Sequence, residues 1–518
     1  MFELIFVTSR SAAFELANRN EYHAPAPFDV FLDGVLWRKD ITTNIFSLFG
    51  LAPDHAYEIN IAGDAILFRT DPETASVDVR SHGAKGDGLT DDTLAVQAAI
   101  TSCPWGGRVW IPEGIYRVYP LFLKSGVTIE LAKGAILLGQ TDRKNYPVLP
   151  ALRQKWDGSA YPLSSWEGET QPTCASVLTA LEVRQARIIG EGIVDANAQH
   201  SDWWSEPRAM RDGAFRAKGI FFSQCDDIAI HGITLQNTPS WALHPFFCKN
   251  ISYIDMKVIN PKDSPNTDGC DPECCDGVRL LGVDFSVGDD CIAIKSGKFD
   301  LGMRYQTPSA HITIRNCRMA DGHGAVVLGS EMSGGIRDLS VTRCLFAGTD
   351  RGLRIKTRRG RGESAVIDGV TFEQIRMDGV LTPFVINMYY FCDADGKTEY
   401  VWSKEKQKID DRTPRLGKFV FRDIVCVNAQ VAAGYFYGLP ERPIGSVTIE
   451  NVSVAFAADA LPGYPAMMSH IEPMCKSGWF FRFVDQVVLK NVEVTGQDGP
   501  AVIRQDVKSF RTATTKPR

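Results

Sequence analysis

Apolar residues recur along most of the chain in short units with the period of a β-strand rather than of a helix. Each unit has apolar side chains at positions 1, 3 and 6, and Asp or Asn often precedes it. The copies begin at Ile228, Ile251, Val278, Ile312, Leu339, Val370, Phe419, Val447 and Val487. The first five start 23 to 34 residues apart. A strand unit that returns at this interval predicts a solenoid, in this case a parallel β-helix whose coils stack about 4.8 Å apart.

Other repeat folds fit this pattern less well. A leucine-rich repeat needs a dense Leu consensus, and a propeller blade needs four strands in about 40 residues. Cys225, Cys248 and Cys275 each stand three residues before the first apolar residue of a copy. This common position predicts a stack of thiols inside the coils. The alternative, a metal site around Cys270, is weaker because no matching Cys or His pair stands at ligand spacing.

The region before the repeats divides into two parts. Residues 1–73 predict a small β domain, with an alternating strand at Phe28–Leu32 and a hairpin turn at Asp33-Gly34. The segment Leu51-Ala-Pro with its following Tyr57 resembles the fibronectin type III pattern. A second domain, the β-helix itself, is expected over residues 77–510.

One short helix is expected where the second domain begins. The segment from Gly86 opens it, Thr90 or Asp91 can cap it, and it runs toward Ile100. We assign no chemistry to the acidic pair Asp91-Asp92, because it lies at a helix start.

Composition excludes several classes of protein. The 518 residues are 44% hydrophobic and 23% charged, which is typical of a globular chain. No stretch approaches the roughly 18 apolar residues of a membrane span. A net charge of −6 argues against a nucleic-acid binder. Thirteen cysteines and an N-terminal apolar run too short for a signal peptide predict a cytoplasmic protein with reduced thiols. A periplasmic location is the alternative if a leader peptide has been removed.

Four polar clusters between residues 266 and 361 carry the candidate chemistry. They are Asn266-Thr-Asp-Gly, Gly288-Asp-Asp-Cys, Gly322-His-Gly and Arg354-Ile-Lys. Their separations, of 21 to 34 residues, match the coil length, so the clusters can stack along one face. Three carboxylates, an imidazole and two cations would then meet in one groove. Glycoside hydrolysis needs such carboxylates, and crowding raises the pKa of at least one of them.

These four motifs, in this order on a coil repeat, resemble the polygalacturonase family, glycoside hydrolase family 28. The wider likeness runs from Val77 to about residue 500 and includes Pro239-Ser-Trp-Ala-Leu-His-Pro. The resemblance implies an all-β, right-handed parallel β-helix and a hydrolase that cleaves α-1,4-linked galacturonic acid with inversion. It implies galacturonate oligo- or polysaccharide as substrate, with no cofactor and no metal. It also implies a gap between the carboxylates of about 6.5–9.5 Å, wide enough to seat a water molecule.

The resemblance also assigns roles to single residues. Asp289 matches the proton donor, and Asp268 and Asp290 match the pair that activates water. His323 matches the histidine that supports the site. Substrate-binding roles fall to Arg354 and Lys356, which would grip a galacturonate carboxylate, and to His244, Glu331 and Arg358.

Some of these residues have a structural interpretation too. The run from Arg351 to Arg361 holds six basic residues, and for Arg358, Arg359 and Arg361 a role in binding and a solvated surface carry equal weight. For the aromatic residues Trp203, Trp204 and Trp241 the alternatives are sugar platforms and core positions, and the core is favoured in a solenoid.

The mode of cleavage is expected to be exo. Residues 387–416 form an insertion, because the repeat copies that flank it start 49 residues apart. Such an insertion, together with the extra N-terminal domain, can close one end of a groove. Related bacterial exo-acting enzymes resemble this segment. Three alternatives stay open: a hydrolase of rhamnogalacturonan or another decorated pectin, a Ca²⁺-dependent pectate lyase, and an inert carbohydrate-binding β-helix.

Overall fold

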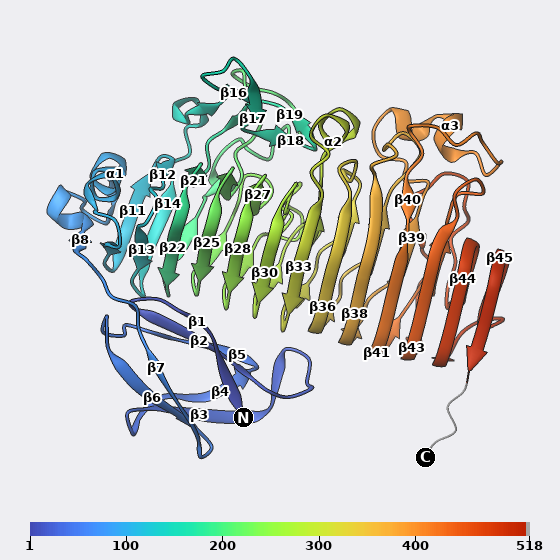
Figure 1. Cartoon of the computed structure of the whole chain (residues 1–518), viewed down its shortest axis with the longest axis horizontal. Coiled ribbons are helices and arrows are strands. Elements are labelled where there is room, and N and C mark those ends of the chain that lie inside the picture. The colour runs from blue at the N-terminus through green and yellow to red at the C-terminus, as the bar shows by residue number, and fades with distance from the viewer. Residues whose placement is uncertain (514–518) are drawn as a thin grey trace.

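The computed structural model describes residues 1–513 and contains a long right-handed parallel β-helix with a smaller β domain against its N-terminal half (Figure 1). The β-helix confirms the fold predicted from the repeat. Within the described residues, no helix is long and apolar enough to cross a membrane. The helices are α1 (Thr93–Ser102), α2 (Phe299–Tyr305) and α3 (Glu399–Trp402), with short 3₁₀ turns at Val79–His82, Arg143–Asn145, Ala198–His200 and Asp395–Lys397.

The coils have three faces, each a ladder of parallel strands. The first face contains β10 (Arg108–Ile111), β13 (Thr128–Leu131), β22 (Arg184–Gly190), β25 (Asp226–His231), β28 (Lys249–Ile254), β30 (Asp276–Leu281), β33 (Ser309–Arg315), β36 (Ile336–Ala347), β38 (Val366–Asp378), β41 (Lys418–Ala429) and β43 (Ile444–Phe456). The second begins with β11 (Gly114–Val118), β14 (Ala135–Gly139), β23 (Ile193–Asp195), β26 (Thr234–Gln236), β29 (Lys257–Ile259), β31 (Asp284–Ser286) and β34 (Arg318–Ala320), and continues in the far halves of β36 and the longer strands.

The third face carries the chemistry. Its strands are β12 (Leu121–Phe122), β21 (Leu178–Leu181), β24 (Ile220–Ser223), β27 (Leu243–Phe246), β32 (Ile292–Ile294), β35 (Val326–Gly329), β37 (Arg351–Lys356), β39 (Thr382–Asn387), β42 (Ala432–Tyr437) and β44 (Ser477–Thr495). One column of partners runs through Leu243, Cys270, Ile292, Val326 and Leu353. Residues at matching offsets from this column are therefore neighbours on successive coils.

The remaining strands lie at the ends of the coils or in loops. They are β8 (Ser76–Asp78), β9 (Asp87–Asp91), β15 (Val148–Leu149), β16 (Leu152–Gln154), β17 (Ala160–Pro162), β18 (Ser165–Trp166), β19 (Glu169–Thr170), β20 (Thr173–Cys174), β40 (Arg415–Leu416) and β45 (Val502–Ala513). The predicted helix is α1. Asp92 is its N-cap residue, and the Asp91 carboxylate accepts a hydrogen bond from the Thr93 amide at 3.0 Å.

The interior of the coils is apolar, as the repeat predicts. The thiols of Cys225, Cys248 and Cys275 are buried and stacked, since the Cys225 amide lies 3.4 Å from Cys248 Sγ and the Cys248 amide lies 3.4 Å from Cys275 Sγ. Burial raises the pKa of the Cys248 thiol well above its usual range. The stack is therefore a set of small, inert core side chains.

The first seven strands form two small sheets. They are β1 (Phe2–Val7), β2 (Ser11–Leu16), β3 (His23–Leu32), β4 (Val35–Thr43), β5 (Ile45–Phe49), β6 (Ala56–Ile61) and β7 (Asp64–Arg69). One sheet has the order β1-β2-β5 and the other β4-β3-β6-β7. The expected hairpin turn is present, with Asp33 and Gly34 both at positive φ between β3 and β4.

This domain is held on the β-helix by buried polar contacts. Glu15 is 1% exposed and forms ion pairs with Arg315 and Arg343 of the coils. Its carboxylate also accepts a hydrogen bond from Asn316 Nδ2 at 2.9 Å. His231 is buried between the Ser11 and Ser47 hydroxyls, at 3.0 and 2.7 Å. The two parts therefore share one specific interface.

Removing the carboxylate at this interface should destabilise the protein. In the Glu15→Ala variant, two arginines lose the only carboxylate that pairs with them in residues 1–513, which should cost about 2 kcal/mol in the free energy of unfolding. Urea unfolding measures this loss. The exposed Glu3→Ala change in the same domain is the control and should alter stability by less than about 0.5 kcal/mol. Equal stabilities of the two variants would contradict a role for Glu15 in docking.

Candidate active site

The third face brings the four sequence motifs together. Asp268 stands just before the bridge at Cys270, and Asp289 and Asp290 stand just before β32. His323 stands just before β35 on the next coil. One oxygen from each of the three carboxyl groups can be chosen so that all lie within 4.8 Å of one another. The coil period therefore converts a spacing in the sequence into a cluster in space.

The expected gap of about 6.5–9.5 Å is the spacing between whole carboxyl groups; the distance between nearest oxygens does not give that spacing, so the gap stays a prediction. The nearest oxygens themselves lie close together, within 4.8 Å of one another. The reason is the ladder itself: the bridge from Cys270 to Ile292 places Asp268 and Asp290 at the same position on adjacent coils. Adjacent strands are only about 4.8 Å apart, so short side chains at such positions cannot be further separated without turning away.

Asp290 is the ionised member of the cluster. Its carboxylate is 1% exposed and accepts from Lys356 Nζ at 2.7 Å and from Arg354 Nη1 at 3.1 Å. Burial alone would raise the pKa of Asp290, but Lys356 and Arg354 outweigh burial and hold the pKa below its usual range. The two cations, expected to grip substrate, thus have a partner within the protein that the sequence did not predict.

The geometry of β37 explains how both cations reach Asp290. Arg354 and Lys356 alternate along the strand with Leu353 and Ile355, which are fully buried in the core. Residues i and i+2 of a strand point the same way, so the two cations project together from the outer side of the coil.

Asp268 has the opposite electrostatic environment. Its side chain is 3% exposed, and its Oδ1 has no hydrogen-bond partner among the described residues. Burial is the main cause that raises the pKa of Asp268 well above its usual range, and the nearby Asp271 and Asp289 add to it. Crowding was expected to produce a protonated acid; burial contributes more than crowding. Asp271 is a further buried carboxyl beside Asp268 that sequence reasoning missed.

His323 lies at the open side of the cluster. Its ring is 56% exposed, and Nδ1 lies 3.3 Å from Asp289 Oδ1. This contact with Asp289 raises the pKa of His323 above its usual value. Asp289 is itself 24% exposed, more than Asp290. The most accessible carboxylate therefore faces the imidazole and the solvent side of the pocket.

A small cavity of about 100 Å³ lies over the three carboxylates. Its wall includes the predicted Glu331 and other residues that the prediction missed, namely Glu167, Arg208, Lys295, Ser330, Tyr390, Cys392 and Asp393. Lys295 had a signal in the sequence, because Ile292-Ala-Ile-Lys repeats the pattern of Leu353-Arg-Ile-Lys. The aromatic and acidic wall residues come from loops outside the repeat, where no such signal exists.

Three expected substrate-binding residues have different environments. Glu331 lines the cavity and pairs with Lys295 at 3.3 Å. His244 is fully buried, with Nε2 3.1 Å from Glu273 Oε2, so the prediction that it binds substrate is wrong. It follows a core-facing residue on β27 and packs between coils. Arg358 is 1% exposed and pairs with Asp393 and Asp395 of the insertion. It therefore lies outside the carboxylate cavity and holds a loop.

The insertion at residues 387–416 contributes directly to the site. Tyr390, Cys392 and Asp393 line the cavity, so the first part of the insertion forms one wall. A second segment, before β44, adds to this side: Asn387 Nδ2 donates to the Met467 carbonyl at 3.0 Å, and Arg354 Nη2 lies 2.6 Å from Met467 Sδ. Two loops from distant parts of the sequence therefore enclose the C-terminal side of the carboxylate cluster.

Known proteins are similar to this chain in both sequence and fold. The sequence model "Glycosyl hydrolases family 28" matches residues 128–411, and "Rhamnogalacturonase A/epimerase, pectate lyase-like" matches residues 76–154. A probable polygalacturonase of Vitis vinifera is 29% identical over 409 residues, 75% of this chain and 77% of that protein. An exo-poly-alpha-D-galacturonosidase of Dickeya chrysanthemi is 26% identical over 383 residues, 65% of this chain and 61% of that protein.

Among solved structures, the family 28 exopolygalacturonase of Yersinia enterocolitica matches with a TM-score of 0.72. That match has 19% sequence identity and covers 99% of this chain and 98% of the other. The exopolygalacturonase of Thermotoga maritima matches with a TM-score of 0.65 and 22% identity, over 82% of this chain and 92% of that one. At these identities the two structures establish the shared fold.

The opposed environments of Asp268 and Asp290 predict opposite effects on stability. Since the pKa of Asp268 is raised, the folded protein keeps this proton at pH values where the unfolded chain, with a pKa of about 3.9, has lost it. Wild-type stability is therefore lost as pH rises, by up to about 1.4 kcal/mol per pH unit. Asp268→Asn removes this loss, so its advantage over wild type should grow from pH 4 to pH 7 in urea unfolding.

Asp290→Asn is the matched control. Because the pKa of Asp290 is lowered, its charge stabilises the fold above the unfolded pKa, and that contribution is lost as pH falls. This variant should therefore be less stable than wild type at pH 7 and approach it in acid. A difference from wild type that stays constant with pH in both variants would contradict the assignment.

Proposed function

The chain belongs to glycosyl hydrolases family 28, and on that premise we propose that it hydrolyses α-1,4-linked galacturonic acid from the ends of polygalacturonate or oligogalacturonide chains. The family match covers more than half of the chain, which makes it a glycoside hydrolase. The observation that carries the proposal is the cluster of Asp268, Asp289 and Asp290 in a small cavity beside two cations. Such a set supplies an acid, a base and a carboxylate-binding group.

Asp289 acts in this proposal as the general acid. Its carboxyl group is accessible from the cavity and lies beside His323. As the glycosidic bond breaks, Asp289 gives its proton to the leaving oxygen, which would otherwise depart as an alkoxide. The imidazolium of His323 then stabilises the carboxylate that Asp289 becomes.

Asp290 and Asp268 act on the attacking water. Asp290 is ionised by Lys356 and Arg354, so it accepts the proton that water loses as its oxygen bonds to the anomeric carbon. Asp268, whose pKa burial raises, keeps its proton and orients the same water by a hydrogen bond. The water attacks opposite the leaving group, which gives the inversion that characterises the family.

The proposal of exo action rests on the size and walls of the cavity. A volume of about 100 Å³ and walls from two loops suit the end of a chain better than its middle. Tyr390 of the insertion supplies one wall, and the neighbouring segment at Met467 and Met468 reinforces it. The Dickeya relative, named for exo action, aligns over much of this chain.

We also keep as proposals a cytoplasmic location and the absence of nucleic acid among its partners. The thirteen cysteines carry free thiols, and the net charge is −6. In that compartment the substrate would be short oligogalacturonides rather than wall polymer, which fits attack at chain ends.

Lys356 should affect catalysis through Asp290 as well as through substrate. Lys356→Met removes the shorter ion pair, so the pKa of Asp290 should rise and the base should ionise at higher pH. We expect the acidic limb of the kcat/KM profile to move up by about one pH unit. Methyl-esterified oligomers, which lack the substrate charge, should lose activity too. A loss confined to the free-acid substrate, with the pH profile unmoved, would contradict the link to Asp290.

Product release from polygalacturonate tests the proposed reaction. We expect reducing ends to accumulate while viscosity stays high, and mass spectrometry should find short saturated products. Asp289→Asn is the inactive control, and its kcat should fall by at least about 100-fold. A rapid loss of viscosity would establish endo action. Unsaturated products would establish a lyase. The absence of any product from polygalacturonate and from oligogalacturonides would overturn the assignment.

A further inference from the structure

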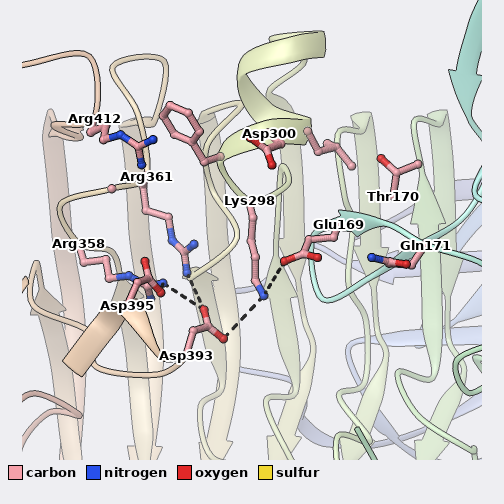
Figure 2. A pocket seen from close by; sticks show the side chains of 13 residues that line it. Glu169, Thr170, Gln171, Lys298, Asp300, Arg358, Arg361, Asp393, Asp395 and Arg412 are labelled. Carbon is pink, nitrogen blue, oxygen red and sulfur yellow. Dashed lines mark hydrogen bonds and ion pairs between the residues drawn. The ribbon is translucent and has the colours of Figure 1, made fainter. Parts of the chain in front are cut away.

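A second and larger pocket adjoins the carboxylate cavity. It has a volume of about 450 Å³, and Asp393 lines both spaces. We call it the outer pocket and define it by Lys298, Phe299, Asp300, Arg358, Arg361 and Arg412 (Figure 2). Arg358 and Arg361 are two of the three arginines for which the sequence gave equal weight to substrate binding and to a solvated surface. Arg359, the third, is buried against Glu441 and has a structural role.

Most charges in the outer pocket neutralise one another. Asp393 receives Lys298 at 3.7 Å, Arg358 at 3.1 Å and Arg361 at 3.5 Å. Figure 2 shows these three side chains converging on Asp393 or lying beside it. Asp395 forms an ion pair with Arg358 at 2.8 Å, and Glu169 forms one with Lys298 at 3.5 Å. These groups hold the insertion against the coils and leave little charge for a ligand.

Arg412 differs from the other cations of the outer pocket. No carboxylate in residues 1–513 lies within 4.0 Å of its guanidinium, which stands 4.4 Å over the centre of the Phe299 ring. Its backbone carbonyl accepts hydrogen bonds from the amides of Gly360 at 2.9 Å and Gly362 at 3.2 Å. The backbone of Arg412 is thus held by hydrogen bonds, and its guanidinium stacks on the Phe299 ring. The guanidinium N–H donors have no acidic partner among the described residues.

Among residues 1–513, Asp300 is the other charged group of the outer pocket that has no ion-pair partner. It is exposed, lies in the first turn of α2 and lines the same pocket. Figure 2 shows Asp300 and Arg412 apart from each other along the same edge of the pocket. An anionic ligand in the outer pocket is therefore attracted by Arg412 and repelled by Asp300. Its affinity depends on how close it lies to each of these two groups.

We propose that the outer pocket is a binding site for the part of the substrate chain beyond the cleaved bond, in which Arg412 pairs with the carboxylate of a uronate residue. The inference rests on the proposed function. It follows from Asp393, which lines both spaces and so places them side by side, and from the one guanidinium of the outer pocket without an acid partner among the described residues. A planar guanidinium offers two parallel donors to a carboxylate, which a neutral sugar cannot use. Asp300 weakens the same contact by repulsion.

A series of oligogalacturonates separates this site from the catalytic one. For wild type, kcat/KM should increase from the shortest cleaved oligomer to the pentamer. Arg412→Ala should lose about tenfold on the pentamer and less than about twofold on the shortest substrate. Methyl-esterified pentamer should show a much smaller loss, because a neutral ester accepts only a weaker hydrogen bond and forms no ion pair with a guanidinium. Asp300→Asn should act in the opposite direction and raise kcat/KM on the pentamer by about twofold.

Lys408→Ala is the matched control, since it removes an exposed cation from the same insertion outside the outer pocket. It should leave the length dependence unchanged. Equal losses on short and long oligomers after Arg412→Ala, or no loss on the pentamer, would overturn the inference. A loss that is the same for free-acid and methyl-esterified pentamer would do so as well. An inactive wild type would instead refute the proposed function, so the two failures are distinguishable. Thermal unfolding shows whether the Arg412→Ala variant is folded. If it is not, the Asp300→Asn variant tests the outer pocket independently.

Discussion

The backbone hydrogen-bond ladder of the third face is the constraint on which the site depends. Each coil repeats the same strand one level further along, and the column from Leu243 through Cys270, Ile292 and Val326 fixes the register. Side chains that are a coil apart in sequence therefore lie about 4.8 Å apart in space. A cluster of buried carboxyl groups is unfavourable, but the backbone hydrogen bonds of the ladder hold it in place. The scaffold thus supplies the rigidity that catalytic geometry requires.

Burial then gives chemically identical groups different protonation states. Asp268 and Asp290 are both nearly inaccessible, yet the pKa of one is raised and that of the other is lowered. The difference lies in what reaches them: Asp290 has Lys356 and Arg354, whereas Asp268 faces the buried carboxyl of Asp271. Environments that separate the pKa values of neighbouring carboxyls are the usual way in which one site supplies both acid and base.

Loops decide the shape of the space in which this chemistry occurs. The coils provide an open face, and Tyr390 of the insertion closes one side of it together with the segment at Met467. Buried ion pairs fix the insertion, since Arg358 and Arg361 both reach Asp393. The N-terminal domain is anchored elsewhere, through Glu15 and His231 on the first face, so it does not line the carboxylate cavity.

The sequence by itself determined the features that follow from regular repetition. The strand unit predicted the β-helix, the interval between copies predicted the stack of Cys225, Cys248 and Cys275, and the same interval placed Asp268, Asp289, Asp290 and His323 on successive coils. A period is local information, and parallel strands convert it directly into position. The repeat could not predict the environment of a residue whose contacts come from distant parts of the sequence. Only the tertiary structure showed that His244 is enclosed between coils and that Arg354 and Lys356 pair with Asp290. It also decided which of the arginines from 358 to 361 face a pocket. These outcomes depend on which loop or side chain, remote in sequence, supplies the partner of a buried charge, and no period encodes that choice.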